Sequence, residues 1–192
     1  MARKLSLRQQ NRLTAMRVVQ AASVAMFETD GFDATTVEAV AEATGVSAST
    51  IYRHFGTKEA LVLWDEQDAS VDAELAERLG AQSPLQAFKE AVVVALTNRE
   101  DMDLFLRRLR LIYSEASIWR AAALQDQVDR AELTAAFAAT GGPRRATIAD
   151  EVAAASCLAA LDVALDRWQQ SNAQTSLADV IDEAINAVAS LS

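Results

Sequence analysis

Apolar residues recur along the chain at the three- and four-residue spacing of amphipathic helices, and no stretch alternates apolar and polar residues as a strand would. The first helical segment covers residues 8–30 and stops at Gly31. The apolar residues expected on its inner face are Val18, Val19, Ala22, Met26 and Phe27. Capping residues and breaks then predict further helices at about 36–44, 48–54, 57–79, 84–97, 101–115, 117–139, 146–170 and 176–191. The pattern therefore predicts an all-α protein of about nine helices.

The amino-acid composition excludes several classes of protein and leaves the all-α prediction unchanged. The 192 residues include only two prolines and six glycines, and 51% are hydrophobic, which excludes collagen-like and disordered chains. No segment approaches the roughly 18 apolar residues of a membrane span, and no apolar run follows the basic N-terminus to make a signal peptide. The single cysteine cannot form an intrachain disulfide. We expect a soluble cytoplasmic protein without a cofactor.

The charge of the chain is distributed unevenly. The net charge is −9, yet residues 1–58 carry seven basic and five acidic residues, a net of +2, while residues 59–192 carry a net of −11. The basic residues Arg3, Lys4, Arg8, Arg12 and Arg17 precede any acid. A polyanion would therefore be attracted to the N-terminal end alone, although a solvated basic tail explains the same charges.

Residues 37–54 have the spacing of a helix-turn-helix. Ala41 is small enough for two helices to cross closely, and Gly45 tolerates the positive φ that the turn requires. Val40, Val46 and Ile51 are placed to anchor both helices from beneath. A simple αα-corner has the same features, so this spacing alone leaves DNA binding open.

The longer motif is specific. The segments at 32–37 (FDATTV), 41–47 (AEATGVS), 50–55 (TIYRHF) and 57–61 (TKEAL) closely resemble the N-terminal domain of TetR-family transcriptional regulators, over about residues 15–63. The resemblance implies a three-helix DNA-binding domain with a basic N-terminal extension at 1–58. It also implies a helical effector-binding and dimerisation domain at 59–192.

The same resemblance implies roles for individual residues. The helix at 48–54 is expected in the major groove of double-stranded operator DNA. Phosphate contacts are expected from Thr36, Tyr52 and Lys58, with Thr57 capping the helix at which Lys58 lies. Base contacts are expected from Ser47, Ser49, Thr50 and Arg53, with a methyl contact from Ala48. His54 is either a DNA contact or a ring packed at the domain edge. The extension that would reach the backbone or minor groove comprises Arg3, Lys4, Arg8 and Arg12.

Two copies are expected, because one small motif reads too few base pairs. The last two predicted helices carry apolar stripes that would pair with a symmetry mate in a four-helix bundle, as is usual in this family. The interface residues expected are Leu158, Leu161, Leu165, Val180, Ile181, Ala184 and Val188. The alternative is that these stripes face only the chain's own core.

The resemblance also places an effector pocket between residues 60 and 170. The residues expected to line it, unless they simply pack in the core, are Trp64, Phe88, Phe105, Arg108, Tyr113, Trp119 and Trp168. Arginine in the apolar helix at 101–115 needs an anion, supplied by an internal carboxylate or by an effector such as an amphiphilic acid. We expect the effector to tilt the helix at 57–79 and thereby to release a repressor from DNA.

Two other classes of function remain to be weighed. An enzyme is disfavoured, because one histidine and one cysteine cannot build a His-rich zinc or di-iron site, and Cys157 lies among apolar residues. We therefore expect no catalytic residue and no metal. A helical adaptor without sequence-specific DNA binding remains an alternative, because the recognition helix presents mainly hydroxyl groups and the chain is acidic.

Overall fold

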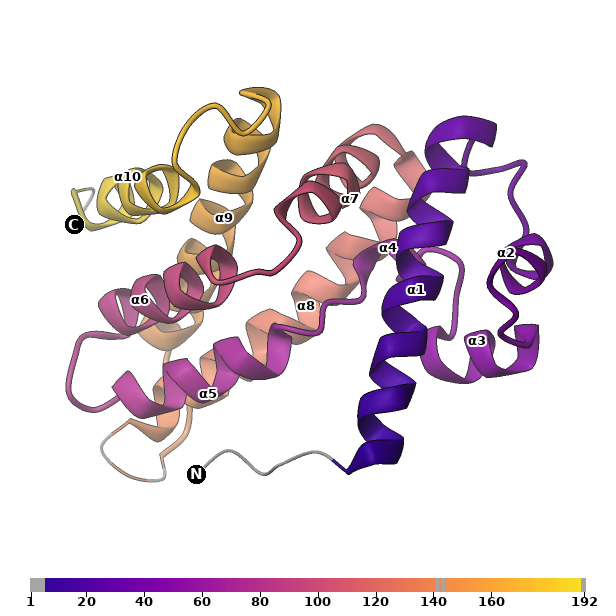
Figure 1. Ribbon diagram of the computed structural model, residues 1–192. Coiled ribbons are helices and arrows are strands. Elements are labelled where there is room, and N and C mark those ends of the chain that lie inside the picture. The colour runs from indigo at the N-terminus through magenta and orange to yellow at the C-terminus, as the bar shows by residue number, and fades with distance from the viewer. Residues whose placement is uncertain (1–5, 141, 143, 191–192) are drawn as a thin grey trace. The chain divides into compact units, whose positions relative to one another are not determined.

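The computed structural model describes residues 6–140, 142 and 144–190, and this part of the chain folds into ten α-helices and no strand (Figure 1). Arg3 and Lys4 of the expected N-terminal extension, and residue 191 at the end of the last predicted helix, lie outside the described residues. The all-α class is confirmed. The helices are α1 (Leu7–Asp30), α2 (Val37–Thr44), α3 (Ala48–Phe55), α4 (Ala60–Leu63), α5 (Asp68–Arg78), α6 (Pro84–Thr97), α7 (Met102–Ser114), α8 (Ala116–Ala139), α9 (Ile148–Gln170) and α10 (Leu177–Ser190).

One predicted helix is wrong: the segment at 57–79 forms two helices, α4 and α5. At Trp64 the chain leaves the helical conformation, with ψ at 127°. The side-chain amide of Gln20 donates hydrogen bonds to the carbonyls of Leu61 and Trp64, at 3.1 and 2.7 Å. The carboxylate of Asp65 accepts a hydrogen bond from the backbone N–H of Gln67 at 2.8 Å. These side chains replace the backbone partners that a continuous helix would have supplied.

The chain divides into two compact units. The first contains the described residues up to Trp64 together with Arg110–Ala121, and the second contains Asp65–Leu109 with the described residues from 122 onward. No helix in the described part is long and apolar enough to cross a membrane. The functional division at residues 58 and 59 stays a prediction.

The core of the first unit lies where α1 meets α2, α3 and α4. From α1 the side chains of Met16, Val19, Val24 and Phe27 are buried. Val18 is 51% exposed, which corrects its expected place on the inner face. The buried face therefore follows a 16–19–24–27 pattern, and Val18 is one position out of register with it.

The second unit is built around α6, α9 and α10, with α5 packed against α6. Buried residues from these helices include Phe88, Cys157, Trp168 and Ile185. The indole N–H of Trp168 donates to the carbonyl of Thr175 at 3.1 Å, which joins the end of α9 to the turn that precedes α10. Cys157 lies in this core as expected of a small hydrophobic residue, and burial raises the pKa of its thiol to about 12.

Candidate nucleic-acid interface

The corner between α2 and α3 is fixed by local interactions that the sequence encodes. Thr36 caps α2 by accepting a hydrogen bond from the N–H of Ala39 at 3.1 Å. Gly45 follows α2 in the left-handed conformation, with φ at +69°, and its N–H donates to the carbonyl of Ala41 at 2.9 Å. Ser47 then caps α3. The chain thus turns sharply from α2 into α3, as the helix-turn-helix spacing predicts.

Burial decides which face of α3 is available to a partner. Val40 from α2 and Ile51 and Phe55 from α3 are buried beneath the corner. On α3 the side chains of Tyr52 and Arg53 are exposed. The other expected base-reading residues lie at the start of α3, where Ser47 and Ser49 are exposed and Ala48 and Thr50 are half-buried.

The hydroxyl groups at the start of α3 bond to one another. The Ser47 hydroxyl lies 2.8 Å from that of Thr50 and 3.2 Å from that of Ser49. A hydroxyl both donates and accepts, so each group keeps capacity for an outside partner. The surface is therefore held in place before any partner arrives, and it is polar with one strong positive charge, that of Arg53.

Lys58 has an internal role that the sequence did not reveal. Its ammonium donates hydrogen bonds to the carbonyls of Phe32 and Thr35, at 2.6 and 3.1 Å, and lies 4.1 Å from the centre of the Phe32 ring. Lys58 therefore ties the start of α4 to the segment that leads into Thr36. An ammonium has three N–H donors, so one remains for an outside acceptor. Thr57 accepts a hydrogen bond from the N–H of Ala60 at 3.2 Å, as expected of a capping residue.

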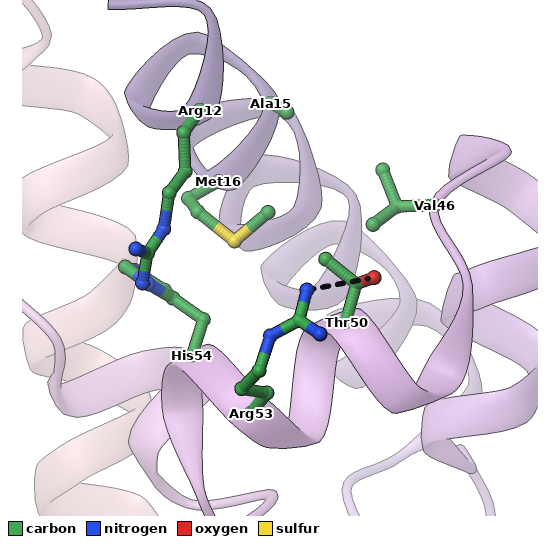
Figure 2. A pocket seen from close by; sticks show the side chains of 7 residues that line it. All are labelled: Arg12, Ala15, Met16, Val46, Thr50, Arg53 and His54. Atoms are coloured by element: carbon green, nitrogen blue, oxygen red, sulfur yellow. Dashed lines mark hydrogen bonds between the residues drawn. The ribbon is translucent and has the colours of Figure 1, made fainter. Parts of the chain in front are cut away.

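His54 is packed at the edge of the unit and is held by an arginine from α1. The Arg12 guanidinium donates a hydrogen bond to Nδ1 of His54 at 2.9 Å (Figure 2). The imidazole also meets the rings of Phe55 and Trp64 edge-on, with centroids 4.7 and 5.2 Å away. Burial, with a smaller effect of the Arg12 charge, lowers the pKa of His54 below its ordinary value of 6.5. The neutral imidazole is therefore favoured at pH 7. Because Nδ1 accepts the hydrogen bond from Arg12, the ring proton lies on Nε2.

Comparison with known proteins identifies this corner. Residues 20–63 match the family model of bacterial regulatory proteins of the tetR family. Residues 20–63 are therefore a domain of the TetR family. The matched residues run from α1 through the helix-turn-helix to α4, so the family assignment covers the candidate DNA-binding corner.

Solved structures of a repressor and of transcriptional regulators share the fold over nearly the whole chain. One is NalD of Pseudomonas aeruginosa, a secondary repressor of the MexAB-OprM multidrug efflux pump (18% identity, TM-score 0.57, covering 93% of this chain and 95% of NalD). Another is a TetR-family transcriptional regulator from Rhodococcus sp. (19% identity, TM-score 0.54, covering 91% and 96%). A third is a transcriptional regulator from Rhodococcus sp. Rha1 (21% identity, TM-score 0.52, covering 90% and 94%). These identities establish the shared fold alone, and no curated protein sequence matches the chain.

The expected effector residues are divided between the two units of the chain. Phe88, Phe105, Arg108 and Trp168 belong to the second unit, where all four are buried and the rings of Phe105 and Trp168 lie 5.8 Å apart. The expected residues in the first unit are Trp64, Tyr113 and Trp119, of which Trp64 packs against His54 and Phe55 while Trp119 is exposed. Core packing accounts for the buried rings, and a ligand role for the set stays a prediction.

The buried arginine in α7 has an internal partner. Arg108 is only 6% exposed, and its guanidinium lies 3.3 Å from the carboxylate of Asp65. Arg99 pairs with the same carboxylate at 2.7 Å and stacks 4.1 Å over the ring of Phe105. Burial alone would raise the pKa of Asp65, but Arg108 and Arg99 together hold it below its ordinary value. Since an internal carboxylate meets the need of Arg108 for an anion, that residue gives no independent support for an acidic effector.

The expected dimer residues differ in accessibility. Ile181 is completely buried (0% exposed) in the core of its own unit, so it is corrected from an interface residue to a core residue. The remaining six are half-buried: Leu158, Leu161, Leu165, Val180, Ala184 and Val188. A second apolar stripe lies on the face of α9 that points away from the core, and it comprises Ile148, Val152 and Val163, all more than half exposed. Sequence reasoning placed Val152 on the apolar stripe of this helix but missed Ile148 and Val163, because α9 is apolar around most of its circumference.

The described part of the chain contains no cluster of histidine, cysteine, aspartate and glutamate side chains that could hold a metal ion.

Proposed function

We propose that the chain is a dimeric repressor that binds a palindromic operator and is released from it by a small molecule. The observation that carries this proposal is the helix-turn-helix corner within a TetR-family domain, because it presents an exposed α3 that bears hydroxyl groups and Arg53. Tyr52, 44% exposed on the same helix, is available to a phosphate beside the groove. In this proposal α3 supplies base contacts, and Lys58 and Thr36 supply phosphate contacts at its flank.

The proposed dimer joins two copies through α9 and α10. The stripe formed by Ile148, Val152 and Val163 supports this choice, because three exposed large apolar side chains share one face of α9 and would be covered by a partner. A two-fold axis would pair each stripe with its own copy. The two recognition helices would then meet successive turns of DNA, on the order of 34–36 Å apart.

The dimer is tested by adding a charge to the stripe. Val163→Lys should convert the dimer to a monomer in sedimentation velocity, because a lysine buried in an isologous interface occurs twice and lacks a partner. Val18→Lys is a matched control, since both valines are 51% exposed and Val18 lies on α1. If the Val163→Lys variant is still a dimer at micromolar concentration, the interface lies on another face of the protein.

The effector is proposed to bind within the second unit and to act on the connection at residues 64–67. Asp65 begins this unit and is held by Arg99 and Arg108, so a ligand that rearranges these side chains would move the residue next to Trp64. To release the repressor, the ligand must bind the DNA-incompetent state more tightly than the competent one. This route replaces the single rigid helix expected from the sequence.

DNA binding is tested first by selecting genomic fragments with the purified full chain and then by measuring fluorescence anisotropy on the fragment obtained. The selected motif should be a palindrome, and binding should weaken steeply as salt rises. Tyr52→Glu should reduce affinity at least tenfold, because it places a negative charge against the phosphates. Val128→Glu, an exposed apolar residue of α8, is the control for an added charge and should bind normally. Absence of binding at low salt would favour the adaptor.

A further inference from the structure

A hollow of about 260 Å³ lies between α1 and α3 in the first unit (Figure 2). It is lined from α1 by Arg12, Ala15 and Met16, from α3 by Thr50, Arg53 and His54, and between α2 and α3 by Val46. The hollow is far larger than the roughly 30 Å³ that one water molecule occupies in the liquid. It therefore has room for a polyatomic ligand.

Two arginines of this hollow have no acidic partner in the described part of the chain. Arg12 donates to the neutral Nδ1 of His54 at 2.9 Å, and Arg53 donates only a long hydrogen bond, 3.5 Å, to the Thr50 hydroxyl. By contrast, the buried arginines of the second unit share the carboxylate of Asp65. Each guanidinium has five N–H donors, so most donors of Arg12 and Arg53 remain unused.

The two guanidinium groups reach the hollow from different helices. In Figure 2 the side chain of Arg12 comes from α1 and that of Arg53 from α3, and Met16 lies between them. The hydrogen bond to His54 fixes Arg12, which reduces the side-chain entropy that binding would otherwise cost. Two guanidinium groups in one hollow, with the Thr50 hydroxyl beside them, suit a phosphate group, because its several acceptor oxygens can bind both at once.

We propose that the hollow between α1 and α3 is a phosphate-binding site, in which Arg12 and Arg53 clasp one phosphate group and Thr50 adds a hydroxyl contact. His54 is the positioning residue that orients Arg12. The phosphate comes from one of two sources. If it is the backbone of bound DNA, the inference rests on the proposed function and assigns Arg53 and Thr50 to the backbone in place of a base. If it is a free phosphate ion, the inference does not rest on the proposed function. The two arms of the experiment distinguish these sources.

The first arm uses the full chain without DNA. His54 is the only histidine in the sequence, so its imidazole gives a single set of NMR signals. Inorganic phosphate is titrated at pH 7.5 against sodium chloride of equal ionic strength. A free-phosphate site predicts a saturable shift of the imidazole signals that is lost in Arg12→Gln and in Arg53→Gln. Arg120→Gln removes an exposed arginine of α8 in the same unit and should leave the shift intact.

The second arm measures DNA affinity as a function of salt for the same variants. If the hollow seats a backbone phosphate, Arg12→Gln and Arg53→Gln should each reduce the slope of log K against log salt by about one, and Arg120→Gln should leave it unchanged. Arg12→Lys keeps the charge but loses the planar fork, so it should retain the slope and bind several-fold more weakly.

The outcomes separate cleanly. A phosphate-specific shift, or a reduced slope in both hollow variants but not in the control, supports the site and names its source. If neither reading differs between the hollow variants and Arg120→Gln, the proposal is overturned. If the wild-type chain binds no DNA, the proposed function fails, and the NMR titration alone decides the site. The Arg53→Gln variant should fold normally, because Arg53 is exposed and makes only a long hydrogen bond, so its result is not explained by misfolding.

Discussion

Replacing Asp65 with asparagine should destabilise the second unit strongly. The Asp65 carboxylate neutralises two guanidinium groups at once, from Arg99 at 2.7 Å and Arg108 at 3.3 Å, and the three side chains are 7–12% exposed. Removing one member of a buried ion pair leaves an uncompensated charge and costs about 3–5 kcal/mol. Asparagine keeps one acceptor oxygen, so we expect the lower end, about 3 kcal/mol. For a chain of this size that corresponds to a fall in Tm of roughly 6–12 °C.

The measurement is thermal unfolding followed by circular dichroism at pH 7.5. Asp103→Asn is the matched control, because Asp103 also pairs with an arginine, Arg107 at 3.7 Å, but its side chain is 79% exposed. Exposed pairs contribute about 0–1 kcal/mol, so the control should lose less than about 4 °C. Combining Asp65→Asn with Arg108→Met should restore part of the stability, since it removes one of the orphaned charges. An Asp65→Asn protein that unfolds within about 2 °C of the wild type would refute this reasoning.

The other predictions concern the DNA-binding corner and the dependence of stability on pH. Gly45→Ala should cost about 1 kcal/mol in urea unfolding, from backbone conformation alone, because no atom lies within 4 Å of the added Cβ; a neutral effect would contradict the left-handed turn. Lys58→Met should cost about 1.5–3 kcal/mol by the same measurement, because the Lys58 ammonium donates to two backbone carbonyls; unchanged stability would leave Lys58 a purely DNA-facing role. The pKa of His54 is lowered, so the folded state prefers the neutral ring, and stability should fall as pH drops through 6.5; an NMR titration that gives His54 a pKa above 6.5 would contradict this. Desolvation of the carboxyl, with repulsion from Asp65 and Asp129, raises the pKa of Asp68 to about 7, although the residue as a whole is exposed. Its protonated form is thus favoured on folding, so its contribution to stability should be lost as pH rises from about 4 through 7, and Asp68→Asn should remove that part of the pH profile.

Features that depend on neighbouring residues could be predicted from the sequence. Thr36 and Ser47 cap α2 and α3, and Ser83 and Pro84 begin α6, which agrees with the helices predicted at 36–44, 48–54 and 84–97. Each of these signals acts within one helical turn, so the residues that form the contact are adjacent in the sequence. The helix-turn-helix corner could therefore be placed to within a residue.

Features that depend on distant partners could not be predicted. The break between α4 and α5 requires Gln20, which lies 41 and 44 residues before the carbonyls that it satisfies. The partners of Asp65 lie 34 and 43 residues away. No glycine or proline marks the break, and nothing in the apolar pattern pairs one particular carboxylate with one particular arginine. The Arg12–His54 contact, 42 residues apart, escaped prediction for the same reason.

The break between α4 and α5 changes how a signal from an effector could be transmitted to DNA. A continuous helix would carry a tilt rigidly from one end to the other, whereas residues 64–67 leave the helical path and need side-chain partners to hold them. To transmit a signal, this connection would need a second arrangement in which other side chains satisfy it, and coupling requires the effector to favour one of the two. Asp65 is the residue through which the second unit holds this connection, by way of Arg99 and Arg108. An effector that breaks this pairing must bind the rearranged state more tightly than the original state. The difference in binding free energy that the proposed release from DNA needs is therefore comparable to the energy of the pairing.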